Sequence, residues 1–261
     1  MGVTPNTEMY EAVIRAWTNT GTRDGLILAE DWAKRAVSSG SPIRLETFHP
    51  IIASWALCQF DRAPARVKEW IHQLNGLSAT HPHLKPDLSM ISALFVAWVN
   101  VQAGIIAKSN QAKKSSSASD GRLNGTSVDS SHQSSDGGKV SQDVDMVFVA
   151  AQNCMEELKT VLTEGSKREY SQDTVALNSM VGNTIKTWGC ASRFALLHPT
   201  TSSASRDASH GVQEMLKISK IVKDRAGFDN VNNNDFDDDE QAYFNFQLIG
   251  QSYAEIISQL H

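Results

Sequence analysis

The chain has 261 residues, of which 41% are hydrophobic and 20% charged. This composition predicts a soluble protein made of one elongated array or about two ordinary domains. No apolar run approaches the roughly 20 residues that a membrane-spanning helix needs, so we expect no membrane span. The net charge of −5 is concentrated in residues 227–261, which hold seven acids and no Lys or Arg. The remaining chain has no strong positive charge, so binding through phosphates alone is not expected, and neither is a DNA partner.

The three cysteines, Cys58, Cys154 and Cys190, are far apart and form no C-x-x-C pair. They therefore predict neither a disulfide framework nor a zinc ribbon, and a reducing compartment fits best. Cys58 and Cys190 lie beside predicted tryptophan-containing helices, where a buried apolar role is favoured over that of a nucleophile. Residues 1–10 show neither a secretory signal nor an amphipathic transit peptide, so we expect no targeting segment in this chain.

The first two predicted helices cover Glu8–Asn19 and Asp24–Ser38, with Asp24 expected to cap the second. The first helix has large apolar residues at i, i+3, i+4 and i+7, the spacing of an amphipathic helix. These residues are Tyr10, Val13, Ile14 and Trp17. Two further helices with the same pattern are predicted over Glu46–Cys58 and Ala63–Leu77.

A further helix is expected over Asp87–Val101, after which the composition changes. Residues 108–142 are rich in Ser, Gly, Asp and Lys and hold almost no large apolar side chain, which predicts a disordered insertion. A helix over Asp143–Thr163 then supplies the missing partner. Val181–Trp188 and Val212–Val222 are expected to form a less regular fourth unit. The predicted organisation is helical repeats over 1–107, the insertion over 108–142, the rest of the third repeat and a degenerate fourth over 143–226, an acidic linker over 227–241, and a terminal half-repeat helix over 242–261.

A tryptophan follows a short apolar segment three times, at Trp17, Trp55 and Trp98, with spacings of 38 and 43 residues. Trp32 and Trp70 also lie 38 residues apart. Such periodicity predicts an all-α protein, an α-solenoid of about four and a half stacked helix-turn-helix repeats. The tryptophans could stack on bases, but their place on the apolar stripe favours packing between helices.

The first unit combines a Pro-Asn opening, an early tyrosine and further short motifs. They are Pro5-Asn6-Thr7, Tyr10, Ala12-Val13-Ile14 and Ala16-Trp17, then Ala29-Glu30 and Lys34-Arg35. Pro86-Asp87 repeats the opening. Over roughly two thirds of the chain this pattern resembles the pentatricopeptide repeat. The resemblance implies a tetratricopeptide-like α-solenoid that binds single-stranded RNA, about one base per repeat, in organelle RNA metabolism, and therefore a location in mitochondria or plastids.

In that family, two positions per repeat read a base, and short polar side chains usually occupy them. The corresponding pairs here are Ala12 with Leu45, Pro50 with Leu88, Ala93 with Asn178, and Asn183 with Tyr243. Asn178 and Asn183 fit the family's pattern and are candidate RNA-binding residues. The other pairs are mostly apolar, and they suit equally well an alternative function as a protein-protein interaction scaffold of tetratricopeptide-like type.

Three basic residues outside the apolar stripes, Arg15, Arg66 and Lys186, are further candidates for RNA contact, although they could simply keep the surface hydrated. RNA binding predicts that they converge on one positive groove. A flat or apolar groove would favour a protein partner instead.

Other chemistry has weak support. The acidic run 229–240 resembles a calcium loop, but Val231 and Asn234 stand where an oxygen ligand and a glycine are needed, so a solvated linker is favoured. His81-Pro82-His83 lies in a polar turn without further metal ligands. No nucleotide-binding or hydrolase motif is present. We therefore expect no enzyme, no metal and no cofactor.

Because a repeat starts at Pro5 and a half-repeat comes last, the chain could also be a fragment of a longer array.

Overall fold

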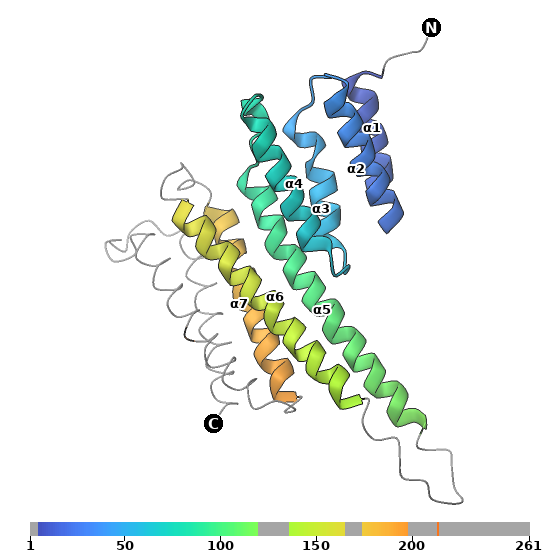
Figure 1. Ribbon diagram of the computed structural model, residues 1–261, viewed down its shortest axis with the longest axis vertical. Helices are drawn as coiled ribbons and strands as arrows, with labels where there is room; N and C mark the ends of the chain where they lie inside the picture. The colour runs from blue at the N-terminus through green and yellow to red at the C-terminus, as the bar shows by residue number, and fades with distance from the viewer. Residues whose placement is uncertain (1–4, 120–135, 165–173, 198–212, 214–261) are drawn as a thin grey trace, which may run out of the picture. The chain divides into compact units, whose positions relative to one another are not determined.

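The computed structural model describes residues 5–119, 136–164, 174–197 and 213 (Figure 1). Every regular element among them is helical, which confirms the predicted all-α class. The elements are α1 (Thr7–Thr18), α2 (Arg23–Ser38), the 3-10 turn η1 (Leu45–Thr47), α3 (His49–Leu57), α4 (Ala63–Ser78), the 3-10 turn η2 (Pro82–Leu84), α5 (Leu88–Ser119), α6 (Asp136–Glu164) and α7 (Thr174–Leu197).

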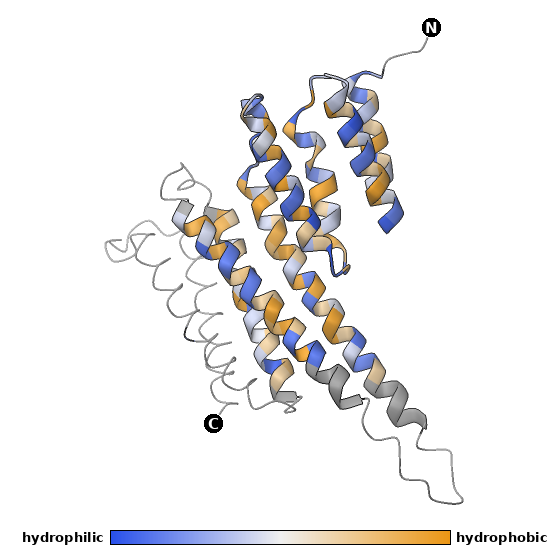
Figure 2. Ribbon diagram, in the orientation of Figure 1, coloured by the Kyte–Doolittle hydropathy of each residue, from blue (hydrophilic) through white to orange (hydrophobic). Residues whose placement is uncertain are grey.

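The chain divides into two compact units. Unit 1 comprises residues 1–101 and 170–177, and unit 2 comprises residues 102–169 and 178–261. Helices α5 and α7 therefore each contribute residues to both units. Hydrophobic and hydrophilic residues alternate along α6 (Figure 2), as expected for a helix with one buried side.

Unit 1 begins with two capped helices. The side chain of Asn6 accepts a hydrogen bond from the Met9 N–H, and Thr22 accepts one from the Gly25 N–H. The predicted cap at Asp24 is therefore wrong. Because α2 starts at Arg23, Thr22 occupies the N-cap position, and Asp24 lies in the first turn, where its charge suits the helix dipole. A Cβ on Gly25 would lie only 2.9 Å from the Trp17 carbonyl oxygen, so the close approach of the start of α2 to the end of α1 requires glycine.

Two helix pairs make up most of unit 1. Helix α1 packs against α2 and α3 against α4, and both α1 and α2 contact α3. The rings of Tyr10 and Trp32 lie 6.1 Å apart between α1 and α2. The rings of Phe48 and Trp70, each 38 residues further along, lie 5.7 Å apart at the corresponding place of the second pair. The two pairs thus contain the same aromatic contact at the same spacing.

The tryptophans divide into two groups by exposure. Trp55, Trp70 and Trp188 are each 3% exposed, so they pack inside the protein as the sequence predicts. Trp17, Trp32 and Trp98 are only half-buried. The indole N–H of Trp70 donates to the buried carboxylate of Glu30 at 2.9 Å, which links α2 to α4.

A buried polar side chain ties together the three helices described in unit 2. Gln102 of α5 is 1% exposed. Its amide nitrogen donates to the carbonyl oxygens of Val147 in α6, at 3.1 Å, and of Thr187 in α7, at 2.8 Å. Apolar side chains such as Val144, Leu158 and Met180 are buried in the same unit. One amide thus fixes the register of three helices.

The helices extend into both ends of the segment for which disorder is predicted. Helix α5 continues to Ser119 and α6 begins at Asp136, so the prediction is corrected over 108–119 and 136–142. The physical reason is that a helix already anchored by packed residues needs no new nucleus to grow, and Ser, Lys and Asp oppose its extension only weakly. Residues 120–135, most of Val212–Val222, the acidic linker 227–241 and the helix Ala242–Gln259 lie outside the described residues.

One helical stretch within the described part of the chain, Pro82–Ala112, has the length and apolar composition of a membrane span. This is weak evidence, because the core helix of a soluble protein meets the same test, and 44% of the apolar window is buried inside the protein. Asn100 and Gln102 within it donate hydrogen bonds to neighbouring helices. The absence of a membrane span stays a prediction.

Candidate functional site

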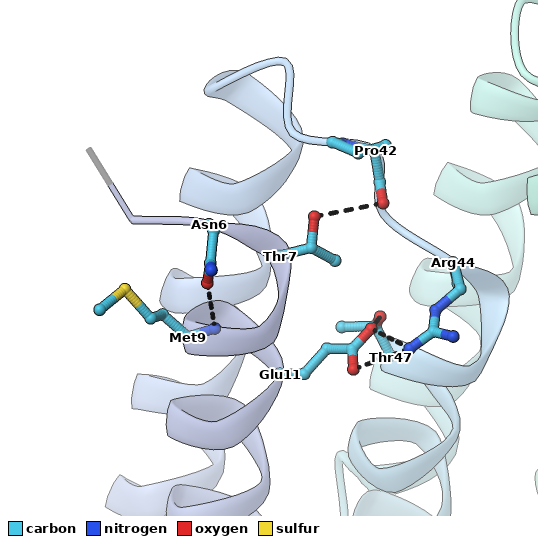
Figure 3. A network of polar contacts seen from close by, with 7 residues as sticks. All are labelled: Asn6, Thr7, Met9, Glu11, Pro42, Arg44 and Thr47. Carbon is cyan, nitrogen blue, oxygen red and sulfur yellow. Dashed lines mark hydrogen bonds and ion pairs between the residues drawn. The ribbon is translucent and has the colours of Figure 1, made fainter.

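A polar cluster joins α1 to the segment that precedes α3 (Figure 3). One terminal nitrogen of Arg44 donates to both carboxylate oxygens of Glu11, each at 3.1 Å. The hydroxyl of Thr47 donates to the same carboxylate at 3.2 Å. The Arg44 side chain is 66% exposed and the Glu11 side chain only 19%. A solvent-exposed guanidinium therefore covers a mostly buried carboxylate.

Local backbone structure places these groups. Gly40, with a φ of 70°, lies just beyond the end of α2 and turns the chain back towards α1. The Thr7 hydroxyl then donates to the Pro42 carbonyl oxygen at 3.4 Å, which joins this segment to the beginning of α1. Arg44 follows two residues later and faces Glu11. The first turn of α1 is thus joined to the segment that carries Arg44.

The cluster borders a depression of about 210 Å³ in unit 1. Its polar lining holds two acidic and two basic side chains, so their charges balance. Its apolar lining comes from the buried Ile14 and the half-buried Pro50. The lining residues are Glu11, Ile14, Arg15, Arg44, Glu46, Thr47 and Pro50.

A second polar link lies at the corresponding place of the next helix pair. His49, 38 residues after Glu11, approaches Asp87 with its Nε2 2.8 Å from the carboxylate. The other oxygen of Asp87 accepts hydrogen bonds from the Met90 N–H and the Ser89 hydroxyl. Partial burial alone raises the pKa of Asp87, but the hydrogen bonds from Met90 and Ser89 together with His49 outweigh it and lower the pKa. Helix α1 is thus bonded to the segment before α3, and α3 is bonded in the same way to the segment before α5.

Of the basic candidates predicted from the sequence, Arg15 lines the depression and Arg66 contacts other side chains. Arg66 forms ion pairs with Glu69 at 3.0 Å and with the buried Glu30 at 3.8 Å. Its guanidinium also lies 5.9 Å from the centre of the Trp55 ring. Arg66 therefore pairs with a buried acid of α2, and it is not among the residues that line the depression with Arg15.

The other three candidates lie on α7. Lys186 is exposed. Asn183 is half-buried, and its amide donates to the Ser179 hydroxyl at 3.5 Å. Asn178 belongs to the same helix, but its side chain lies outside the described residues. The positions of Asn183 and Lys186 belong to unit 2, whereas Arg15 and Arg66 belong to unit 1.

Sequence reasoning missed Glu11, Arg44, Glu46 and Thr47. A signal was available, because each early aromatic is followed directly by a titratable residue, in Tyr10-Glu11 and in Phe48-His49. Only the contacts in the structure show that these residues face the segments that precede α3 and α5.

The cysteines do not offer an activated thiol. Burial raises the pKa of Cys154 to about 11, and it also raises the pKa of Cys58 and Cys190. A raised pKa leaves little of the nucleophilic thiolate near neutral pH.

Among the described residues, no group of three or more His, Cys, Asp and Glu side chains is placed to hold a metal. His83 donates to the Ile43 carbonyl oxygen at 3.1 Å, so it joins the loop after α4 to the loop after α2. The acidic run 229–240 lies outside the described residues. Comparison with protein-family models, with curated proteins and with solved structures finds no match for this chain.

Proposed function

We propose that this chain is a helical-repeat protein whose unit 1 binds a protein partner in the depression between α1 and α3. The repeat assignment is supported by the matching ring contacts, Tyr10 with Trp32 and Phe48 with Trp70. It is also supported by the matching polar links of Glu11 and His49 to the segment that follows each pair. A right-handed α-solenoid of pentatricopeptide type accounts for both.

The charge balance of the depression is the observation that favours a protein partner. A groove for nucleic acid depends on positive charge that no acid neutralises. Here Glu11 already pairs with Arg44, and Glu46 lies in the same lining as Arg15. An extended peptide offers both charges, backbone amides and apolar side chains, so it can match such a mixed surface. Its apolar residue would contact Pro50, which is half-buried.

Single-stranded RNA binding and a mitochondrial or plastid location, which the resemblance implies, stay predictions. Arg15 lines the depression, whereas Arg66 pairs with acidic side chains. These different contacts give the RNA prediction no further support.

A peptide-display screen against the full chain tests the proposal. Enriched peptides are measured by fluorescence anisotropy against the chain and two variants of the depression, Pro50→Asp and Glu46→Arg. We expect affinity to fall at least about tenfold in one of them, because each introduces a charge that the partner does not match. The matched control is Ala65→Glu, at an exposed position of α4, which should leave affinity unchanged.

The same proteins are tested by filter binding with a pool of single-stranded RNAs at two salt concentrations. Enriched peptides that bind both depression variants as well as the parent chain would contradict the protein proposal. RNA retention at low salt that is lost at high salt would favour the RNA function instead.

A further inference from the structure

Helix α1 carries an apolar stripe that the described residues of unit 1 cover only in part. Its members follow the spacing i, i+3, i+4, i+7 and i+8, and none is buried. They are Met9, Ala12, Val13, Ala16 and Trp17. Met9 is 52% exposed, whereas Tyr10 and Ile14 on the other side of the helix are 6% and 1% exposed.

Helix α2 extends this open face. Leu28 is 37% exposed and Trp32 is half-buried. The guanidinium of Arg35 lies 5.1 Å from the centre of the Trp32 ring. The apolar stripe of α1 and these residues of α2 together form what we call the end face of unit 1.

The corresponding surface of the second helix pair is covered by protein. Ile51, Trp55 and Trp70, each 38 residues after Val13, Trp17 and Trp32, are 0%, 3% and 3% exposed. Helix α2 supplies part of this cover, because Glu30 accepts a hydrogen bond from the Trp70 indole and Lys34 lies 6.0 Å from its ring. A surface of this shape therefore accepts helices packed side by side. Among the described residues of unit 1, the end face has no such cover.

We propose that a second copy of this chain covers the end face, with the two α1 helices antiparallel across a two-fold axis. The charges beside the stripe suit this arrangement. Glu8 and Arg15 are both exposed and lie seven residues apart, so they lie on the same edge of the stripe. Antiparallel pairing brings Glu8 of each copy opposite Arg15 of the other, and the symmetry forms this pair twice. A parallel arrangement would instead put this edge of the two helices on opposite sides of the interface, so Glu8 and Arg15 would not pair.

The size of the face sets the strength of the dimer. Helices of 12 and 16 residues are about 18 and 24 Å long, and two of them side by side present roughly 400 Å². Stable interfaces bury about 800 Å² per partner, so this dimer is weak and forms as the protein concentration rises. The end face is distinct from the depression, except that Arg15 borders both.

Sedimentation equilibrium of the full chain over about a hundredfold range of concentration tests the proposal. We expect a reversible shift from monomer to dimer. Ala16→Glu should raise the dissociation constant at least about tenfold, because it places an unpaired charge in the middle of the stripe. Ala65→Glu adds the same charge at an exposed position of α4 and should leave the dimer unchanged. Equal thermal unfolding of both variants shows that the fold is intact.

A charge exchange tests the antiparallel arrangement. Glu8→Arg and Arg15→Glu should each weaken the dimer, and the double variant should restore it because the two opposite charges then face each other again. A wild-type chain that remains monomeric over the whole range overturns the proposal. Dimerisation that survives Ala16→Glu, or a double variant no better than the single ones, also overturns it.

Discussion

Asp87 holds the beginning of α5 with both of its carboxylate oxygens. One oxygen caps the helix at Met90, and the other meets His49. We expect Asp87→Ala to lower the free energy of unfolding by about 1 kcal/mol at pH 7, the usual cost of losing an N-cap. Urea unfolding measures this cost. Asp31→Ala, at an exposed position within α2, is the control and should change stability by less than about 0.5 kcal/mol.

The lowered pKa of Asp87 gives its contribution a definite pH dependence. Because the pKa in the folded chain lies below the ordinary value of 3.8, the carboxylate stabilises the fold fully above pH 3.8. This stabilisation is lost as the pH falls through the lower folded value. The stability difference between the parent chain and Asp87→Ala should therefore shrink in acid. A difference that grows below pH 3.8 would contradict this assignment.

Cys154 is expected to be the least reactive of the three thiols. With a pKa of about 11, its thiolate fraction is about a hundredfold lower than that of a thiol at the ordinary value of 9.0. A disulfide reagent at pH 8 should therefore label Cys58 and Cys190 first, and Cys154 only after denaturant is added. In Cys154→Ser the late-reacting thiol should be missing. Equal rates for all three thiols in the folded chain would show that Cys154 is not buried.

At the scale of whole elements, Gln102 determines how α5, α6 and α7 fit together. Gln102→Ala removes both hydrogen bonds and leaves a cavity, so we expect a loss of about 2–4 kcal/mol in the free energy of unfolding. Gln102→Leu keeps most of the volume and should cost about 1 kcal/mol. Gln152→Ala, at an exposed position of α6, is the control. If Ala and Leu at position 102 cost the same, the hydrogen bonds rather than the volume are decisive.

The helices were predictable from the sequence where apolar periodicity was strong. The sequence predicts a helix over Glu8–Asn19, and α1 is found over Thr7–Thr18. The agreement is close because the spacing of the buried Tyr10 and Ile14 already indicates which side of the helix is buried. The cap at Thr22 was missed because two residues near the start of α2 could each serve, and only the position of the first turn decides between them. The end of α5 and the beginning of α6 were missed because composition alone does not predict the extension of a helix whose other part is already held by packing.

The candidate site was less predictable than the helices. Arg15 was named from the sequence because it lies off the apolar stripe of its own helix. Arg44 was not, because its partner Glu11 is 33 residues away and the contact depends on the turn at Gly40. Arg66 was named for the same reason as Arg15, yet it pairs with the buried Glu30, a contact between helices that no local pattern encodes.

At the scale of the whole molecule, each of the two units has buried residues of its own. Leu74 of α4 in unit 1 and Leu158 of α6 in unit 2 are both fully buried. Replacing either with Ala should cost about 2–5 kcal/mol locally. Each substitution removes contacts within one unit, so we expect such a loss to stay close to the substituted helix.

Hydrogen exchange measured helix by helix tests this independence. Leu158→Ala should speed the exchange of amides in α6 and the Asn178–Leu197 part of α7, while those of α1 to α4 keep their protection. Leu74→Ala should do the reverse. Helix α5 is the informative element, because it contributes residues 88–101 to unit 1 and residues from 102 onward to unit 2. If the units unfold separately, its two parts respond to different variants. A uniform loss of protection in every helix after either change would show that the chain unfolds as one cooperative body, since α5 would then transmit the loss from one unit to the other.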